Sequence, residues 1–250
     1  MKITHLSLFT GIGGLDLAAE MAGFETVGQC EWADYPTKVL EKHWPNVPRW
    51  RDIRTLTGES FYERTGLRTV DIISGGFPCQ PFSVAGKRRG EEDDRYLWPE
   101  MLRVVQELKP RWVVGENVAG IVSLALDRVL SDLEALQYET RAFVIPACAV
   151  GALHRRDRVC IVAHAGGITL ERGSEEKVLW KPGESQIKSW GVDQTVLERS
   201  AVFEPKLVRT FNGIPDQVDR IKCLGNAVVP QQFFPVFDAI MKIEKGEYEC

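Results

Sequence analysis

The chain has 250 residues, a net charge of −4 at neutral pH, 44% hydrophobic residues and 26% charged residues. These values are ordinary for a globular protein with one large domain, or with one domain and a small companion. No apolar run approaches the ~18 residues of a membrane span. The acidic balance creates no overall basic field, so any nucleic-acid binding must rest on local basic patches.

The cysteines and the start of the chain indicate a reducing compartment. The beginning of the sequence shows no signal-peptide pattern, so we expect a cytoplasmic protein without membrane attachment. The cysteines form no CxxC pair and have no metal-ligand spacing, which argues against a disulfide framework and a zinc site. The six cysteines are Cys30, Cys79, Cys148, Cys160, Cys223 and Cys250.

The first thirty residues predict a strand, a glycine turn, a helix and a second strand. A strand over residues 3–9 runs into the turn 11–14, and a helix is expected over 15–22. The second strand, 25–31, ends in Glu31, and an acid at this place suits the paired hydroxyls of a ribose. The spacing is GxGG and not the dinucleotide fingerprint GxGxxG. Together with Glu31 it predicts a nucleoside-containing cofactor.

Two further side chains are candidates for the same nucleoside. Trp32 follows Glu31 and can stack on an adenine, with an ordinary core position as the alternative. A helix is expected over 33–44. Asp52, at the end of a third strand, can accept a hydrogen bond from an adenine amino group, with an exposed loop position as the alternative.

A stiff loop presents one cysteine at the centre of the predicted sheet. The β-branched run 70–74 predicts a buried strand, and two glycines then allow a sharp turn. Pro78 and Pro81 fix the backbone on both sides of Cys79. Because ligands bind at the carboxyl ends of strands in open α/β sheets, Cys79 is a candidate nucleophile, with a buried structural cysteine as the alternative.

Charged groups follow at two further strand ends. The glycine-rich, charged segment 85–95 predicts either a lid with phosphate-seeking cations or a solvated loop. After a helix over 96–108, the strand 111–114 runs into Glu116, on the edge where Cys79 is expected. Apolar residues at helical spacing, from Val122 to Leu136, predict only core.

The last third of the chain contains an arginine cluster and a change of composition. Strands are expected over 140–145 and 159–163, and three arginines within residues 154–158 precede the second of these. Such charges are costly to bury without anionic partners, so this segment favours a site over a surface turn. Residues 166–215 are polar, with lysines, arginines and tryptophans interleaved, which suits either a nucleic-acid-binding lobe or a flexible insertion. A final amphipathic helix is expected over 231–245.

The ordered motifs resemble those of the DNA (cytosine-5) methyltransferase family. The resemblance covers residues 3–165 and 208–245, and the ordered set is highly specific. The motifs that carry it are Phe9-Thr10-Gly11-Ile12-Gly13-Gly14, Gly76-Phe77-Pro78-Cys79-Gln80-Pro81-Phe82-Ser83, Glu116-Asn117-Val118, Arg155-Arg156-Asp157-Arg158 and Gly225-Asn226-Ala227-Val228-Val229-Pro230.

The resemblance implies an α/β, Rossmann-like domain that binds S-adenosylmethionine, formed by residues 1–165 and 216–250. A small target-recognition domain, residues 166–215, would be inserted before the last motif. The implied cofactor-binding residues are Phe9, Gly11, Gly13, Gly14, Leu15, Glu31, Trp32, Asp52, Ile53, Pro78, Leu97, Asn226 and Ala227. The implied DNA contacts are Gln80, Ser83, Lys87, Arg88, Arg89 and Asn117.

The resemblance also implies a reaction, methyl transfer to C5 of a cytosine flipped out of duplex DNA. Cys79 would add to C6 of the base, and Glu116, with a raised pKa, would stabilise the adduct at N3. Arg158, with Arg156 beside it, would orient the base. His154 and Leu153 depart from the common Gln and Pro of this motif, which we expect to be tolerated because both arginines remain.

Three other functions compete with this one. A tRNA cytosine-5 methyltransferase would use the same scaffold, but the recognition segment lacks the Cys-Phe-Thr signature of that group. A catalytically silent DNA-binding relative is disfavoured because Cys79, Glu116 and Arg158 are all present. A thiol redox protein would need a resolving cysteine, which no CxxC supplies. We expect a monomer that acts on double-stranded DNA. A cognate restriction endonuclease in the same system is a possible partner.

Overall fold

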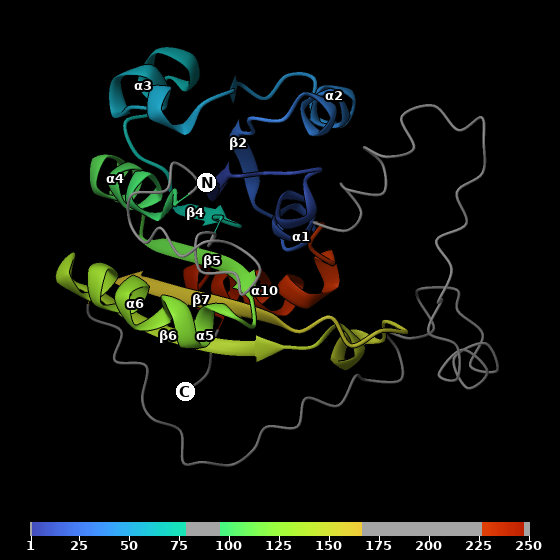
Figure 1. Ribbon diagram of the computed structural model, residues 1–250. Helices are drawn as coiled ribbons and strands as arrows, with labels where there is room; N and C mark the ends of the chain where they lie inside the picture. Colours follow the sequence, from blue (N-terminus) through green and yellow to red (C-terminus); the bar gives the residue numbers. More distant parts are fainter. Residues whose placement is uncertain (1, 79–95, 167–226, 248–250) are drawn as a thin grey trace, which may run out of the picture.

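The computed structural model describes residues 2–78, 96–166 and 227–247, which form a single sheet with helices on both faces (Figure 1). No helix in these three ranges is long and apolar enough to cross a membrane. Within the same ranges, Cys30, Cys148 and Cys160 are free thiols, and no cluster of side chains could hold a metal ion.

The strands and helices alternate along most of the chain. The strands are β1 (Thr4–Leu8), β2 (Glu25–Cys30), β3 (Arg49–Trp50), β4 (Ile72–Gly75), β5 (Trp112–Val118), β6 (Tyr138–Ile145) and β7 (Arg158–Ala165). The α-helices are α1 (Gly14–Met21), α2 (Asp34–His43), α3 (Gly58–Thr65), α4 (Trp98–Leu108), α5 (Ile121–Leu124), α6 (Leu126–Ala135) and α10 (Pro230–Glu244). Short 3-10 turns cover Ile53–Thr55 and Ala147–Val150.

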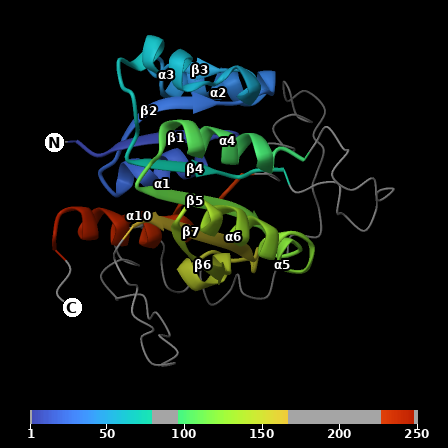
Figure 2. The ribbon, with the colours of Figure 1, turned by 90° about the vertical axis from the view of Figure 1, so that its left-hand side faces the viewer.

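The sheet has the order β3-β2-β1-β4-β5-β7-β6, and Figure 2 shows the strands stacked in this sequence from top to bottom. The neighbours from β3 to β5 pair in parallel, whereas β7 pairs antiparallel with both β5 and β6. The carboxyl ends of β1, β2, β4 and β5 therefore share one edge with the amino end of β7. This edge is where an open α/β sheet binds its ligands.

The core alternates between the two faces of the sheet, as the period of two in a strand requires. Ile73 and Val113 pack in the cluster that α3, α4 and α6 cover. The adjacent Ile72 and Val114 pack in the cluster beneath α1 and α10. Because the central strands are buried on both faces, their sequences read as continuous apolar runs.

The strands and helices expected from the sequence are confirmed, with one difference. The apolar residues from Val122 to Leu136, expected at helical spacing to form core, are divided between α5 and α6 at Ala125, and Val122 is exposed. Ala125 has φ −151° and ψ −2°, which no α-helix accommodates. The apolar residues behind it still reach the core, and Val129 and Leu133 are fully buried.

A buried polar network fixes the start of the sheet. Asp16 lies in the first turn of α1 with no exposed surface and accepts hydrogen bonds from Ser7 Oγ and Gln29 Nε2, both at 2.8 Å. Gln29 Oε1 in turn accepts from Arg49 Nε at 2.8 Å. The network connects β1, α1, β2 and β3, so it fixes the strand ends that surround the glycine turn.

The pH dependence of stability tests this network through Asp16. Burial raises the pKa of Asp16 from its ordinary value of 3.8 to about 6, so the folded state holds the proton more tightly than the unfolded chain. The resulting stabilisation is fully present below pH 3.8 and is lost as the pH rises through about 6. Asp16→Asn lacks this titration. The free energy of unfolding of the wild type relative to Asp16→Asn should therefore fall by about 2–3 kcal/mol between pH 4 and pH 7.5.

Urea unfolding at the two pH values measures this difference. Asp127→Asn, a matched change at an exposed carboxylate in the first turn of α6, is the control. It retains Asp16, so its free energy of unfolding should change with pH as that of the wild type does. The account would be contradicted if the difference in unfolding free energy between the wild type and Asp16→Asn were the same at both pH values.

Candidate active site

The glycine turn between β1 and α1 has the backbone shape of a ligand cradle. Phe9 has φ +52°, and Gly11 and Gly13 have φ +58° and +88°, so the chain reverses within a few residues. A Cβ on Gly13 would lie 2.5 Å from the Trp44 ring, and a Cβ on Gly14 would lie 2.7 Å from the Val228 carbonyl oxygen. Close packing therefore requires glycine at both positions, and the positive φ of Gly13 favours glycine there as well.

Glu31 lies directly after β2 and faces this turn. Its Oε2 accepts from the Gly11 backbone N–H at 2.7 Å, and its Oε1 accepts from the Ala33 N–H at 2.8 Å. A carboxylate has about four acceptor positions, so each oxygen keeps one for a further donor. Two backbone donors thus fix the orientation of the group that the sequence assigned to ribose hydroxyls.

The other residues assigned to the nucleoside lie beside Glu31. Trp32 is 72% exposed, which excludes the alternative of an ordinary core tryptophan. The Arg51 guanidinium donates to the Trp32 carbonyl at 2.7 Å and pairs with Asp34, so it fixes the turn that carries the Trp32 ring. Asp52 Oδ1 accepts from the Arg54 N–H at 3.0 Å, as the cap of the following 3-10 turn, and Ile53 is buried.

The loop after β4 packs directly against β5. The Asn117 Nδ2 donates to the Phe77 carbonyl at 2.9 Å, and Asn117 is only 4% exposed. This contact holds the described start of the cysteine loop, up to the half-buried Pro78. Asn117 therefore positions the loop in this structure, and its predicted DNA contact stays a prediction.

Gly76 touches the carboxylate of Glu116. A Cβ on Gly76 would lie 2.7 Å from Glu116 Oε2, closer than any real Cβ contact. Only a residue without a side chain lets the loop lie this close to the carboxylate. The strand end that carries Glu116 and the loop that continues toward Cys79 are thus in van der Waals contact.

Glu116 and Arg158 form a nearly buried ion pair. Glu116 lies opposite Cys160 in the β5–β7 register, and Arg158 lies opposite Val118, so the two charged residues are diagonal neighbours on one face. Arg158 Nε is 2.7 Å from Glu116 Oε1, with side chains 11% and 12% exposed. Burial raises the pKa of Glu116, and Arg158 and Arg156 oppose part of that rise. The site thus holds a carboxyl group that retains its proton more readily than usual.

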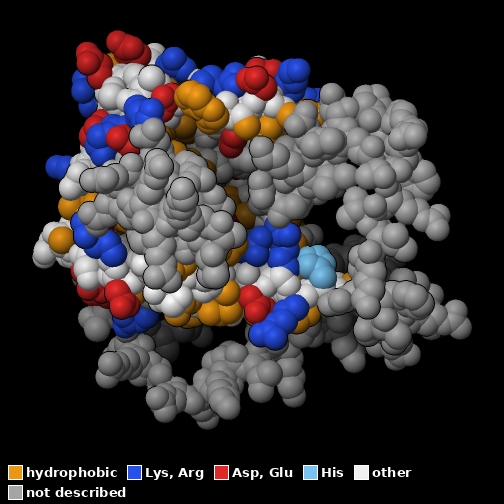
Figure 3. Space-filling view, viewed as in Figure 1, with side chains coloured by type: hydrophobic (Ala, Val, Ile, Leu, Met, Phe, Trp, Pro, Cys, Tyr) orange, Lys and Arg blue, Asp and Glu red, His pale blue; other side chains and the backbone are white. Residues whose placement is uncertain are grey.

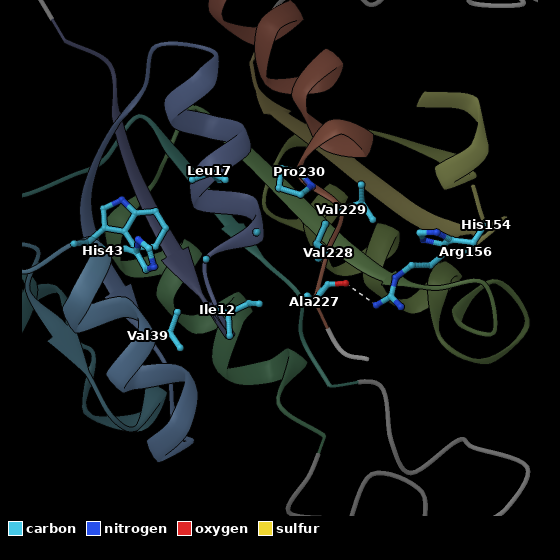
Figure 4. Close-up of a pocket in the computed structure, with 13 residues that line it drawn as sticks. Ile12, Leu17, Val39, His43, His154, Arg156, Ala227, Val228, Val229 and Pro230 are labelled. Carbon is cyan, nitrogen blue, oxygen red and sulfur yellow. Dashed lines mark hydrogen bonds between the residues drawn. The ribbon is translucent and has the colours of Figure 1, made fainter. Parts of the chain in front are cut away.

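Arg156 connects the arginine turn to the start of α10. Its Nη2 donates to the Ala227 carbonyl at 2.5 Å, drawn as a dashed line in Figure 4. The residue has φ +32°, an uncommon conformation for a side chain of this size. By contrast, Leu153 and His154, the two departures from the family motif, are exposed. The arginine turn is thus formed without support from a Pro or Gln side chain at these two positions.

A cavity of about 580 Å³ opens between the glycine turn, α2 and the segment before α10. Ile12, Gly13 and Gly14 line one side, and His154, Arg156 and Ala227 line another, as Figure 4 shows. Figure 3 shows basic side chains next to a histidine at the right of the described surface. The predicted cofactor residues Gly13, Gly14 and Ala227 therefore border the same cavity as Arg156.

The remaining predicted residues divide into two groups. Leu15 is buried at the start of α1, and Leu97 is half-buried and immediately precedes α4. Seven other site residues and most of the predicted recognition domain, residues 167–215, lie outside the described residues, so their predicted roles rest on the sequence alone. The seven are Cys79, Gln80, Ser83, Lys87, Arg88, Arg89 and Asn226.

Two residues that the sequence did not single out contribute to this edge. They are Arg51, which holds the Trp32 turn, and Gln232, which is buried in the first turn of α10. Gly76, predicted only as a turn glycine and motif residue, also contacts Glu116. The sequence contains one indication of the role of Gln232, because it is a polar residue on the otherwise apolar face of a helix. The roles of Gly76 and Arg51 depend on neighbours that are distant in the sequence.

Substitution of Gly76 tests the contact between the cysteine loop and Glu116. Ala at this position must displace either the loop or the carboxylate, so we expect Gly76→Ala to lower the free energy of unfolding by about 1–3 kcal/mol. Gly58→Ala is the matched control, because a Cβ there meets no atom closer than 3.8 Å. Urea denaturation measures both variants. Equal unfolding free energies for the two variants would show that the contact does not exist.

Comparison with known proteins identifies the family. The family model for C-5 cytosine-specific DNA methylases matches residues 3–194. The type II methyltransferase M.HgiCII of Herpetosiphon aurantiacus is 32% identical over 98% of this chain and 54% of its own length. M.AquIA of Picosynechococcus is 34% identical over 68% of this chain and 75% of its own length. A crystal structure described as a prophage-encoded DNA modification methyltransferase from E. coli has a TM-score of 0.57 and 26% identity, covering 66% of this chain and 47% of that one.

These similarities confirm the Rossmann-like methyltransferase fold that the sequence predicted. The chain spans about half the length of most curated relatives that it matches. The matched region contains the glycine turn, Glu31, Glu116 and the arginine turn, which the structure brings to one edge of the sheet. The chain therefore belongs to the C-5 cytosine-specific DNA methylase family.

Proposed function

We propose that the protein transfers a methyl group from S-adenosylmethionine to C5 of a cytosine flipped out of duplex DNA. The observation that carries this proposal is the buried pair of Glu116 and Arg158, which lies against Gly76 in the loop that leads to Cys79. A carboxyl group with a raised pKa, beside an arginine and against the loop that continues to a predicted thiol nucleophile, suits the chemistry of a pyrimidine ring.

The residues of this edge divide the reaction among them. The Cys79 thiolate adds to C6 of the base, forming the C6–S bond and making C5 nucleophilic. Glu116 holds a proton at N3 and so stabilises the negative charge that the addition creates. Arg158 keeps Glu116 oriented and donates to the base. After C5 has been methylated, loss of its proton to a base and expulsion of the Cys79 thiolate restore the aromatic ring.

The residues around the glycine turn fit S-adenosylmethionine. The Glu31 oxygens, each with one position left for a donor, suit the two ribose hydroxyls, and the exposed Trp32 ring suits the adenine. Gly11 has no neighbouring atom within 4 Å of a Cβ position, so the turn leaves open space above it. When bound, the cofactor would supply an electrophilic methyl group on a sulfonium, and breaking of the S–CH3 bond would leave a neutral thioether.

Flipping of the base follows from the geometry of duplex DNA, in which C6 and C5 of a stacked cytosine are out of reach of a thiol and a methyl donor. We assign the polar residues 166–215 to target recognition and Lys87, Arg88 and Arg89 to phosphate contacts. The relatives are named type II methyltransferases, which supports a cognate restriction endonuclease as partner. Transfer RNA as substrate is the alternative within the class.

Transfer of a labelled methyl group tests the proposal. The protein is incubated with S-adenosylmethionine carrying a tritiated methyl group, together with duplex DNA of mixed sequence or with total transfer RNA. Label should enter the DNA and be recovered as 5-methylcytosine after hydrolysis. Label in RNA but not in DNA would overturn the proposed substrate.

Cys79→Ser separates the chemistry from cofactor binding. A hydroxyl at neutral pH is a far weaker nucleophile than a thiolate, so we expect methyl transfer to fall at least about 1,000-fold. Calorimetric binding of S-adenosylmethionine should stay unchanged. Equal loss of binding and transfer in a folded variant would contradict the nucleophile role.

A further inference from the structure

Gln232 is a fully buried polar residue in the first turn of α10. Its Nε2 donates to two backbone carbonyls, those of Ile145 at 2.7 Å and Arg156 at 3.0 Å. Both partners are acceptors, so the amide nitrogen must face them and the oxygen must point away. One side chain thus connects the end of β6 with the turn that precedes β7.

The turn that Gln232 holds has a conformation that needs support. Arg156 has φ +32°, and a residue with a long side chain adopts such a conformation only where its surroundings impose it. The preceding carbonyl, that of Arg155, accepts from the Ala147 N–H at 2.6 Å. The two successive carbonyls are therefore held from different elements, one by the 3-10 turn after β6 and one by α10.

The hydrogen bond to the Arg156 carbonyl also bears on the position of Arg158 beside Glu116. Two residues after the held carbonyl, Arg158 lies 2.7 Å from Glu116 Oε1. The Arg156 guanidinium reaches in the other direction, to the Ala227 carbonyl three residues before α10. We propose that Gln232 is the positioning residue of the arginine turn and that its two hydrogen bonds keep Arg158 in place against Glu116.

The proposal deepens the function proposed above and rests on it for its catalytic meaning. The other inward positions of α10 are apolar, including Phe233, Phe237 and Ile240, and they already supply the packing against the sheet. An apolar residue at position 232 would remove the hydrogen bonds that Gln232 donates to the Ile145 and Arg156 carbonyls. The amide at this position therefore serves the backbone of the turn.

The titration of Glu116 reports directly on the position of Arg158. Among the described residues, the groups that face Glu116 are Arg158 and Cys160 from β7, Arg156 from the turn and the backbone at Gly76. The two arginines favour the charged carboxylate and draw its pKa down, against the effect of burial. If Arg158 moves away, the pKa of Glu116 must rise.

The test compares Gln232→Leu with Gln231→Leu, the same substitution one position earlier on the helix, where the side chain is only half-buried. The pKa of Glu116 is measured by carbon-13 NMR of labelled protein without cofactor or DNA. We expect it to rise by at least about one unit in Gln232→Leu, the size of effect that a neighbouring arginine produces. Gln231→Leu should match the wild type.

Kinetics provide a second readout. In Gln232→Leu, kcat for methyl transfer should fall at least about tenfold, with an unchanged KM for S-adenosylmethionine. The alkaline limb of its pH profile should move to higher pH, because Glu116 keeps its proton longer. If Gln232→Leu does not fold, Gln232→Asn takes its place, since its amide is one methylene too short to reach both carbonyls.

The outcomes separate the two proposals. A folded Gln232 variant in which the pKa of Glu116 and kcat both equal the wild-type values would overturn the positioning role. Absence of methyl transfer by the wild type would instead contradict the proposed function, while the NMR titration would still decide whether Gln232 positions Arg158.

Discussion

The ion pair between Glu116 and Arg158 depends on one strand that runs against its neighbours. Because β7 is antiparallel to β5, its amino end lies at the edge where the parallel strands finish. An arginine at the start of β7 thereby meets an acid at the end of β5. Burial of such a pair costs free energy unless neighbouring contacts keep both side chains in position.

The contacts that hold this pair come from distant parts of the sequence. Gly76 approaches Glu116 from the loop after β4, and Asn117 fixes that loop from the opposite face of β5. Gln232 of α10 donates a hydrogen bond to the arginine turn. The same helix packs against α1, which follows the glycine turn directly. The glycine turn and the arginine turn therefore border one cavity, which Figure 4 shows.

The sequence predicted what depends on local pattern. Apolar runs predicted the strands, and the GxGG turn predicted the start of α1. The position of Glu31 directly after β2 was predicted from the end of the second apolar run. It could not predict what depends on register. That Gly76 must be small follows from the Glu116 carboxylate 40 residues later, and that Gln232 is buried follows from how α10 docks. The exposure of Val122 was not predicted because the helical spacing of apolar residues continues through the break at Ala125.

A covalent trap tests the central claim, that this edge activates cytosine through Cys79 with Glu116 holding the proton at N3. Duplex DNA containing 5-fluorocytosine supplies a base that can accept the thiolate and the methyl group but cannot lose a proton from C5. With S-adenosylmethionine present, we predict a stable protein–DNA adduct that peptide mass mapping locates at Cys79, and its absence in folded Glu116→Gln. Methylation of ordinary DNA without any trapped adduct, or an adduct at another residue, would contradict the account.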